Sequence, residues 1–596
     1  MHDDARQGGR EVLRGVVAGE RRRVAAACVL GAAHQTGEAL IPVLIGFIVD
    51  RAVVHPDPAS FVRWALLLAV VYVFLSGGFQ LGARAGEFAT EHAAHTLRMR
   101  LVRRVLDPYG GASRGRPAGA LVSVATEDAM RAGSLTRALP MGFSAVVGLA
   151  AGAVLLLRAS VPLGLLILLG TPVLMGLGQL LARPLEHRSH AEREHAAHAS
   201  GVAADLVAGV RVLQGLGAQR AASDRYRLTS RASLAATVRA ARAEALQTGL
   251  MQTLTGLFIA LVALVGGRLV LSGGIGLGEL VAAVGLALFL PGPLQVVAWV
   301  AADVARSRAS AGRIAEVLSA PGDIAAKATA TATATATAEH PAEPAAGNAE
   351  PASAPDRDPA LTAPGDTPRG ALRLSGLTHE GLSGLELSVA PGEFIGVVVT
   401  EPAHADTLVR CLARQVDPAE GRLELDGVPF TELPPRTLRS RVLVAEHGAE
   451  LFAGSIRDNI AAVTGGAHEA ATAAAGADEV AASVPGGLDA PVGERGRALS
   501  GGQRQRVALA RALAADRDVL VVHDPTTAID AATESRIATG IREIRRGRTT
   551  VLVTSSPALL AVADRVALID DGRLTDEASH EELVRRSSLY RTAVLS

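Results

Sequence analysis

Cysteine, lysine and aromatic residues are scarce in this 596-residue sequence. The two cysteines, Cys28 and Cys411, are too few for a disulfide framework or a thiolate metal site, and we expect both to be small buried side chains. Lys327 is the only lysine. Aromatic residues make up 3% of the chain, so no conspicuous aromatic binding cavity can be identified. No metal site is predicted.

The charges balance, and the formal net charge is +0 at pH 7, so we expect no basic surface and no nucleic-acid partner. Hydrophobic residues reach 49% and the mean hydropathy is +0.28, which is high for a soluble protein. The N-terminus is polar and lacks a compact apolar core, so no cleavable signal peptide is expected. The length predicts at least two domains.

Six stretches in the first half have the roughly 20 apolar residues that a helix needs to cross a bilayer. They cover residues 24–49, 62–84, 138–157, 160–182, 246–271 and 277–302. Short connections join the third stretch to the fourth and the fifth to the sixth, whereas long arginine-rich polar arms follow the second and the fourth. The positive-inside rule therefore predicts cytoplasmic arms and termini. We predict an α-helical membrane domain over residues 1–318, in the cell membrane.

Inside the first stretch, His34 and Glu38 are four residues apart and share one helix face. Ionisable groups at membrane depth usually face a bundle interior or an aqueous cavity, so one interpretation is that they line a polar pathway. The other is that they lie near the membrane interface or pair with each other. Gln80 and Gln252 are further candidates for cavity residues.

A low-complexity run rich in Ala, Pro and acidic residues follows the membrane domain. It cannot bury enough apolar surface to fold, so we predict a disordered linker over 319–370. Beyond it, short apolar runs such as FIGVVV and DVLVVH alternate with helical segments. This pattern is typical of an α/β domain with a mostly parallel sheet, which we place at residues 371–596.

One motif in this second half is highly specific. LSGGQ, followed by RQRVALARAL, resembles the signature motif and helix of ABC ATPases. A helix N-terminus offers free N–H groups to phosphate, and glycines permit close approach. The resemblance implies that this motif contacts the γ-phosphate of ATP held by an opposite nucleotide-binding domain. Its residues are Ser500, Gly501, Gly502 and Gln503.

Other segments extend the resemblance over nearly the whole chain. PTTAID, which ends at Asp530, resembles the D-loop, and segments of the membrane half resemble exporter-type transmembrane domains. The resemblance implies six transmembrane helices of the exporter type and a P-loop-NTPase-like nucleotide-binding domain, with ATP and Mg²⁺ as cofactors.

The positions that bind ATP in cis depart from the family's pattern. The P-loop alignment places Ala405 at the lysine and Asp406 at the Mg²⁺ ligand, and Lys327 in the linker cannot replace the lysine. Further degenerate positions are His447 for the Q-loop glutamine, His523 for the Walker B aspartate, Asp524 for the catalytic glutamate and Ser555 for the switch histidine. A shifted alignment would make Asp524 the Walker B aspartate and put Pro525 at the glutamate. Either way the hydrolytic pair is damaged.

The complete signature beside a damaged P-loop indicates a subunit of a heterodimeric ABC transporter. The predicted partner is a second half-transporter with intact Walker motifs, which would hold most of the ATP and Mg²⁺, while the pair moves an unknown substrate through the lipid bilayer. A homodimer would have two damaged sites. The alternatives are a subunit of an exporter-fold siderophore importer, and a non-transporting regulatory pseudo-ATPase subunit.

Overall fold

The computed structural model describes residues 2–51, 58–324, 369–448, 450–466 and 468–595. They form two compact units, Met1–Arg103 with Pro117–Ser319, and Arg104–Arg116 with Ala320–Ser596. Most of the predicted linker, residues 325–368, lies outside the described residues.

The first unit is entirely helical. Its helices are α1 (His2–Gly19), α2 (Arg21–Val49), α3 (Pro58–Val105), α4 (Ala118–Ser123), α5 (Ala129–Gly133), α6 (Leu135–Ala159), α7 (Val161–Ala208), α8 (Val210–Gly215), α9 (Gln219–Leu271), α10 (Leu277–Phe289) and α11 (Pro291–Leu318). Six described helical segments are long and apolar enough to cross a membrane, which confirms the predicted six spans. These segments are Arg21–Val49, Phe61–Val105, Ala118–Ala159, Val161–Leu181, Gln219–Leu271 and Leu277–Leu318.

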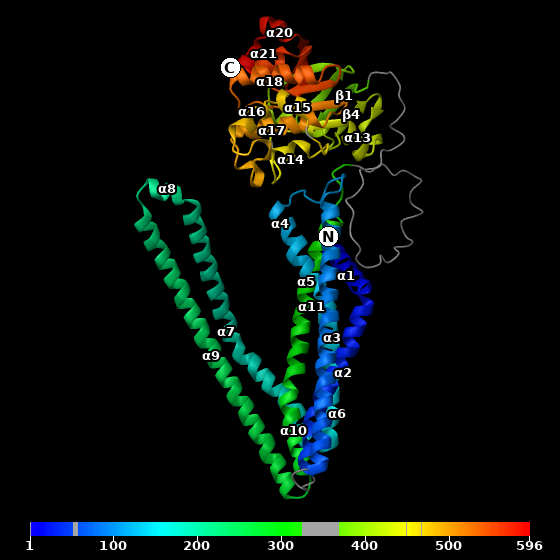
Figure 1. Cartoon of the computed structure of the whole chain (residues 1–596), viewed down its shortest axis with the longest axis vertical. Coiled ribbons are helices and arrows are strands. Elements are labelled where there is room, and N and C mark those ends of the chain that lie inside the picture. The colour runs from blue at the N-terminus through cyan, green and yellow to red at the C-terminus, as the bar shows by residue number, and fades with distance from the viewer. Residues whose placement is uncertain (1, 52–57, 325–368, 449, 467, 596) are drawn as a thin grey trace. The chain divides into compact units, whose positions relative to one another are not determined.

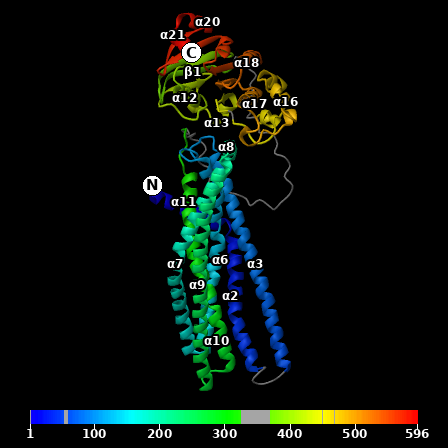
Figure 2. The ribbon, with the colours of Figure 1, turned by 90° about the vertical axis from the view of Figure 1, so that its left-hand side faces the viewer.

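The polar arm after the fourth span consists of the ends of two long helices, α7 and α9, which also contain the fourth and fifth spans. α7 has 48 residues and α9 has 53 residues, and the short α8 joins them. At 1.5 Å per residue, α9 is about 80 Å long, far longer than a bilayer core requires. α7 and α9 pack against each other and diverge from the other helices of the unit toward α8 (Figure 1). The long helices nevertheless share one general direction (Figure 2).

Small residues bring the membrane helices together. α2 and α10 approach so closely that a Cβ added to Gly46 would lie 2.2 Å from the carbonyl oxygen of Gly278. Asp50, just after α2, accepts a hydrogen bond of 2.7 Å from the Gly278 N–H near the start of α10. Backbone contact between glycines is a usual way for helices to associate in lipid, where apolar burial between helices contributes little.

The second unit contains two sheets. An antiparallel sheet has the order β2-β1-β4-β5, and a six-stranded sheet has the order β10-β9-β3-β8-β7-β6. The strands are β1 (Leu372–His379), β2 (Leu382–Val389), β3 (Phe394–Val399), β4 (Glu420–Leu425), β5 (Val428–Pro429), β6 (Val442–Ala445), β7 (Val519–His523), β8 (Thr549–Val553), β9 (Arg565–Asp570) and β10 (Arg573–Ala578). The helices are α12 (Pro402–Leu412), α13 (Pro435–Arg441), α14 (Ile456–Ala461), α15 (Glu469–Ala474), α16 (Ala477–Ser483), α17 (Gly501–Ala514), α18 (Ala531–Ile544), α19 (Pro557–Ala561), α20 (His580–Arg586) and α21 (Ser588–Leu595).

The larger sheet is parallel except for β10, which pairs antiparallel to β9. β7 and β8 are buried along their whole length, as expected for strands with helices on both faces, and their sequences, VLVVH and TTVLV, are mostly apolar. The predicted α/β domain is confirmed. The loops that leave the carboxyl ends of β3, β6, β7 and β8 all emerge at one edge of this sheet, where open α/β domains bind ligands.

Candidate functional site

The carboxyl edge of the parallel sheet gathers the loop that was aligned with the P-loop and three of the degenerate positions named above. Thr400 follows β3, His447 follows β6, His523 ends β7, and Ser555 lies exposed in the loop after β8. Residues more than 150 positions apart in sequence therefore end at one sheet edge, because their strands are parallel neighbours.

The loop at the P-loop position is short and carries the wrong chemistry. Only Thr400 and Glu401 separate β3 from α12, which begins at Pro402, a residue without an N–H to offer to phosphate. The Ala405 side chain is 7% exposed and packs in the core. Asp406 points its carboxylate outward, with 69% of the side chain exposed.

The turn between β1 and β2 lies directly against α12. Gly381 has a φ of +95°, and a Cβ there would lie 2.3 Å from the imidazole of His404. The Thr407 hydroxyl donates a hydrogen bond of 3.3 Å to the Glu380 carbonyl oxygen, and Arg410 forms an ion pair of 2.9 Å with the Glu380 carboxylate. The His404 imidazole thus fills the space between this turn and the start of α12.

Histidine and aspartate side chains cluster at the ends of β6 and β7. His523 Nδ1 lies 3.8 Å from Asp406 Oδ1, and its Nε2 lies 3.8 Å from Asp524 Oδ2. The His447 ring centroid is 6.0 Å from that of His523, and His447 Nδ1 is 3.4 Å from the Asp524 carbonyl oxygen. In the part of the chain that the structure describes, no three such side chains are arranged to hold a metal ion.

These residues do not fit Mg²⁺–ATP. The loop has no lysine for the β- and γ-phosphates, and two carboxylates, Glu401 and Asp406, would face the phosphate charge. The His404 imidazole also fills the space beside Gly381 at the start of α12.

The signature residues, by contrast, form a regular helix start. Ser500 is the N-cap of the 14-residue α17: its hydroxyl accepts the Gln503 N–H at 3.3 Å, and the Gln503 side chain accepts the Ser500 N–H at 2.8 Å. This capping box leaves the N–H groups of Gly501 and Gly502 without a partner within the helix. The helix start is therefore equipped to bind an anion.

The D-loop is fastened to this helix. The Gln505 side chain donates a hydrogen bond of 2.7 Å to Thr527 Oγ1 and accepts one of 3.0 Å from the Ala528 N–H. Gly502 permits the contact, because a Cβ there would lie 2.5 Å from the Ala528 carbonyl oxygen. The sequence did not point to Gln505, although this residue lies only two positions after the signature.

Asp530, at the end of the D-loop, is the N-cap of α18. Its carboxylate accepts a hydrogen bond of 3.0 Å from the Thr533 N–H, and this bond lowers the pKa of Asp530. The aspartate thus stays ionised and fixes the point at which the D-loop enters α18.

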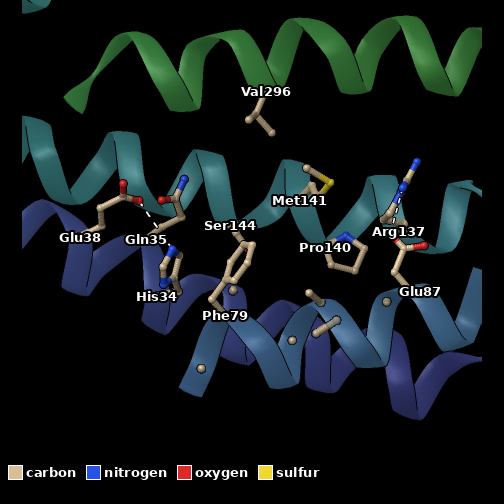
Figure 3. A pocket seen from close by; sticks show the side chains of 16 residues that line it. His34, Gln35, Glu38, Phe79, Glu87, Arg137, Pro140, Met141, Ser144 and Val296 are labelled. Atoms are coloured by element: carbon tan, nitrogen blue, oxygen red, sulfur yellow. Dashed lines mark hydrogen bonds and ion pairs between the residues drawn. The ribbon is translucent and has the colours of Figure 1, made fainter. Parts of the chain in front are cut away.

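The membrane unit contains a cavity of about 420 Å³ among α2, α3, α6 and α11 (Figure 3). Its polar lining residues are His34, Gln35, Glu38, Glu87, Arg137 and Ser144. Half of the lining residues from α3 are glycines at intervals of four, Gly78, Gly82 and Gly86, which form a wall without side chains beside Phe79, Ala83 and Glu87. A second cavity, of about 480 Å³, shares His34 and Glu38.

His34 and Glu38 combine both sequence interpretations: they line the cavity, and His34 Nε2 lies 3.8 Å from Glu38 Oε2. Gln80 and Gln252 are exposed and line neither of these two cavities. The ion pair between Arg137 and Glu87, with 2.9 Å between Nη1 and Oε1, was not anticipated. Both residues lie just outside the predicted apolar stretches 62–84 and 138–157, so no sequence signal pointed to them.

Comparison with known proteins identifies both units. Residues 24–294 match the ABC transporter transmembrane region, and residues 382–527 match the ABC transporter family. A multidrug efflux ATP-binding/permease protein of Mycobacterium tuberculosis is 30% identical over 93% of this chain and 44% of its own length. The chain thus spans less than half of that relative. An ATP-dependent lipid A-core flippase of Chromobacterium violaceum is 27% identical over 93% of this chain and 91% of its own length.

A solved structure of a bacterial Atm1-family ABC exporter with ATP bound has the same fold, with a TM-score of 0.67 at 23% sequence identity. The likeness covers 96% of this chain and 97% of the exporter chain. Six described helices long and apolar enough to cross a membrane, together with matches to both family regions, lead to one conclusion: the chain belongs to the ABC transporters and is a multi-pass membrane protein whose membrane domain is fused to its nucleotide-binding domain.

Proposed function

We propose that this chain is the catalytically silent half of a heterodimeric ABC transporter. Its partner carries the competent P-loop and catalytic glutamate, and the start of α17 in this chain completes the partner's ATP site. The observation that carries the proposal is the contrast between an obstructed loop at Ala405 and a fully capped, accessible helix start at Ser500.

The helix start supplies the phosphate contacts of this composite site. The N–H groups of Gly501 and Gly502 and the hydroxyl of Ser500 reach the γ-phosphate of the partner's ATP, and the positive end of the α17 dipole favours its charge. Mg²⁺ is held by the partner, since Asp406 and His523 replace both metal ligands here. This electrostatic contribution is greatest in the transition state, when charge is spread over the oxygens of the transferred γ-phosphoryl group.

Closure of the working site is coupled to the membrane helices, and hydrolysis by the partner reopens it. The other composite site, built on Ala405, contributes no hydrolysis. The transporter lies in the plasma membrane, with the nucleotide-binding domain and both termini of this chain in the cytoplasm. The arginines of the polar arms favour this orientation. Relatives named as multidrug efflux and lipid A-core flippase proteins support outward transport.

Mg²⁺-dependent ATP hydrolysis by the chain alone and by the chain co-purified with its partner, both in lipid nanodiscs, tests the proposal. Activity is expected only in the pair, and Ser500→Arg should abolish it by placing a bulky side chain where the phosphate binds. Ser579→Arg is the matched control, because Ser579 is also an exposed N-cap serine, at the start of α20. Robust hydrolysis by the chain alone would refute the silent cis site.

A further inference from the structure

The membrane cavity contains an unusual contact between two acceptors. His34 Nδ1 lies 3.0 Å from the Leu75 carbonyl oxygen, which can only accept, so Nδ1 carries the ring proton. In the neutral ring, Nε2 then presents a lone pair to Glu38 Oε2 at 3.8 Å. Neither atom can donate to the other. A donor that bears a positive charge would satisfy both.

The remaining charges of the cavity are already paired. Glu87 binds Arg137, and the Arg137 guanidinium also lies over the Trp299 ring, 5.7 Å from its centroid. No other described residue forms an ion pair with Glu38. With His34 neutral, the cavity therefore carries one carboxylate in excess, which favours a cationic occupant and disfavours an anionic one.

The rest of the lining suits an apolar body. Phe79 lies beside His34, with 5.2 Å between ring centroids, and an aromatic face attracts a cation. Gly78 to Gly86 spans about 12 Å of α3 with glycine at every fourth position, so a flat or elongated group can lie against the backbone.

Ser144 adds an independent sign of a missing ligand. Its side chain is 6% exposed, its hydroxyl has no hydrogen-bond partner, and it lines the cavity wall from α6 (Figure 3). A buried hydroxyl without a partner costs about 1–3 kcal/mol, a penalty that a bound polar group can remove.

We propose that this cavity binds a lipophilic amine in its protonated form, a substrate class that rests on the proposed transport function. The ammonium N–H groups lie between His34 Nε2 and Glu38 Oε2, and the apolar body extends along the glycine wall of α3. A polar group partway along that body accepts or donates a hydrogen bond at Ser144.

Direct binding of radiolabelled propranolol, a protonated secondary amine with a naphthyl ring, tests the assignment. The chain is reconstituted in nanodiscs of zwitterionic lipid, without partner or ATP, and counts from empty nanodiscs are subtracted. Saturable binding is expected, and Glu38→Gln should weaken it about tenfold or more, because a charge-assisted hydrogen bond in a poorly hydrated site is lost. Glu91→Gln removes the same charge from an exposed position of α3 outside the cavity and should change nothing.

A second pair of variants tests the location. Gly78 lines the cavity, and the atom nearest to a Cβ added there is the Leu30 carbonyl oxygen at 3.8 Å. The neighbouring Gly77 does not line the cavity, and a Cβ added there has no atom within 4 Å. Gly78→Leu should fold and lose most of the binding, whereas Gly77→Leu should fold and retain it. 1-Naphthol, which keeps the ring system but has no ammonium group, should not displace propranolol.

Equal affinities for Glu38→Gln and the unchanged chain, or displacement by 1-naphthol, would overturn the assignment. Absence of saturable binding would overturn it too. Because the measurement needs neither hydrolysis nor the partner, such a failure leaves the ATPase experiment to decide on the heterodimer separately.

Discussion

The contact between α17 and the D-loop allows one prediction to be worked through quantitatively. In Gly502→Ala, the new Cβ would lie 2.5 Å from the Ala528 carbonyl oxygen. Carbon and oxygen in close contact are about 3.3 Å apart, so the D-loop must retreat by about 0.8 Å. The hydrogen bond from the Ala528 N–H to Gln505, now 3.0 Å, would stretch beyond its useful range.

The free-energy cost of this displacement follows from the two hydrogen bonds of the Gln505 side chain to the D-loop. If both bonds of the Gln505 side chain are lost, at about 1 kcal/mol each, the D-loop opens about 2 kcal/mol more easily. That difference is about 30-fold in the equilibrium between closed and open forms. Because amide exchange follows local opening, exchange of the D-loop N–H groups should accelerate by a similar factor.

Hydrogen–deuterium exchange of the full chain in nanodiscs, without nucleotide, measures this on peptides that cover Pro525–Asp530. Gly501→Ala is the matched control: its Cβ would lie 3.6 Å from the Ala528 Cβ, an ordinary contact. Both substitutions raise helix propensity alike, so that effect cancels in the comparison. If the two variants exchange at the same rate, the reasoning that Gly502 sets the D-loop position is wrong.

Two further predictions concern the cassette. Ala405→Lys should not restore ATP binding to this chain's own site, because Pro402 still lacks an N–H. Photolabelling of the pair with azido-ATP should mark only the partner. Label on this chain would contradict the conclusion that its own site does not fit ATP. For Asp426, burial raises the carboxyl pKa, but hydrogen bonds from Arg441 and two backbone N–H groups outweigh it and leave the pKa lowered. A carboxyl whose pKa is lower in the folded state stabilises the fold at pH values above its unfolded pKa of about 3.9, and this contribution is lost as the pH falls through the folded pKa. Asp426→Asn should therefore lower the free energy of unfolding by about 1 kcal/mol at pH 7 and by progressively less in acid. Urea unfolding at several pH values measures this difference.

The sequence predicted the architecture because its signals are local. A membrane span needs a continuous apolar run, and a buried parallel strand such as β7 has four apolar residues in succession, so both can be recognised without knowing their neighbours. The polar arm that contains α7 and α9 was predicted by composition alone. Its regular helical structure depends on the packing of two helices against each other, which no single window of sequence encodes.

The candidate sites were predictable only where one motif contains them. Ser500 and Gln503 are three residues apart, so their capping box can be recognised in the sequence. The contact of Glu380 with Arg410 joins a turn to a helix 30 residues later, and its geometry depends on how the two sheets pack. Likewise His34 and Glu38 were identified by their spacing, whereas Ser144 reaches the same cavity only through the packing of α6 against α2.

The glycine wall of α3 has a consequence for how this protein can change. Gly78, Gly82 and Gly86 already carry the smallest possible side chain, so any substitution at these three positions can only narrow the cavity. A single substitution of one of these glycines is enough to narrow it, and at Gly78 the substitution also stabilises the helix backbone. A wider cavity needs a smaller residue at another lining position, such as Phe79 on the same helix. The range of accepted molecules can therefore contract through single changes at the glycines but expand only through changes at the larger lining residues.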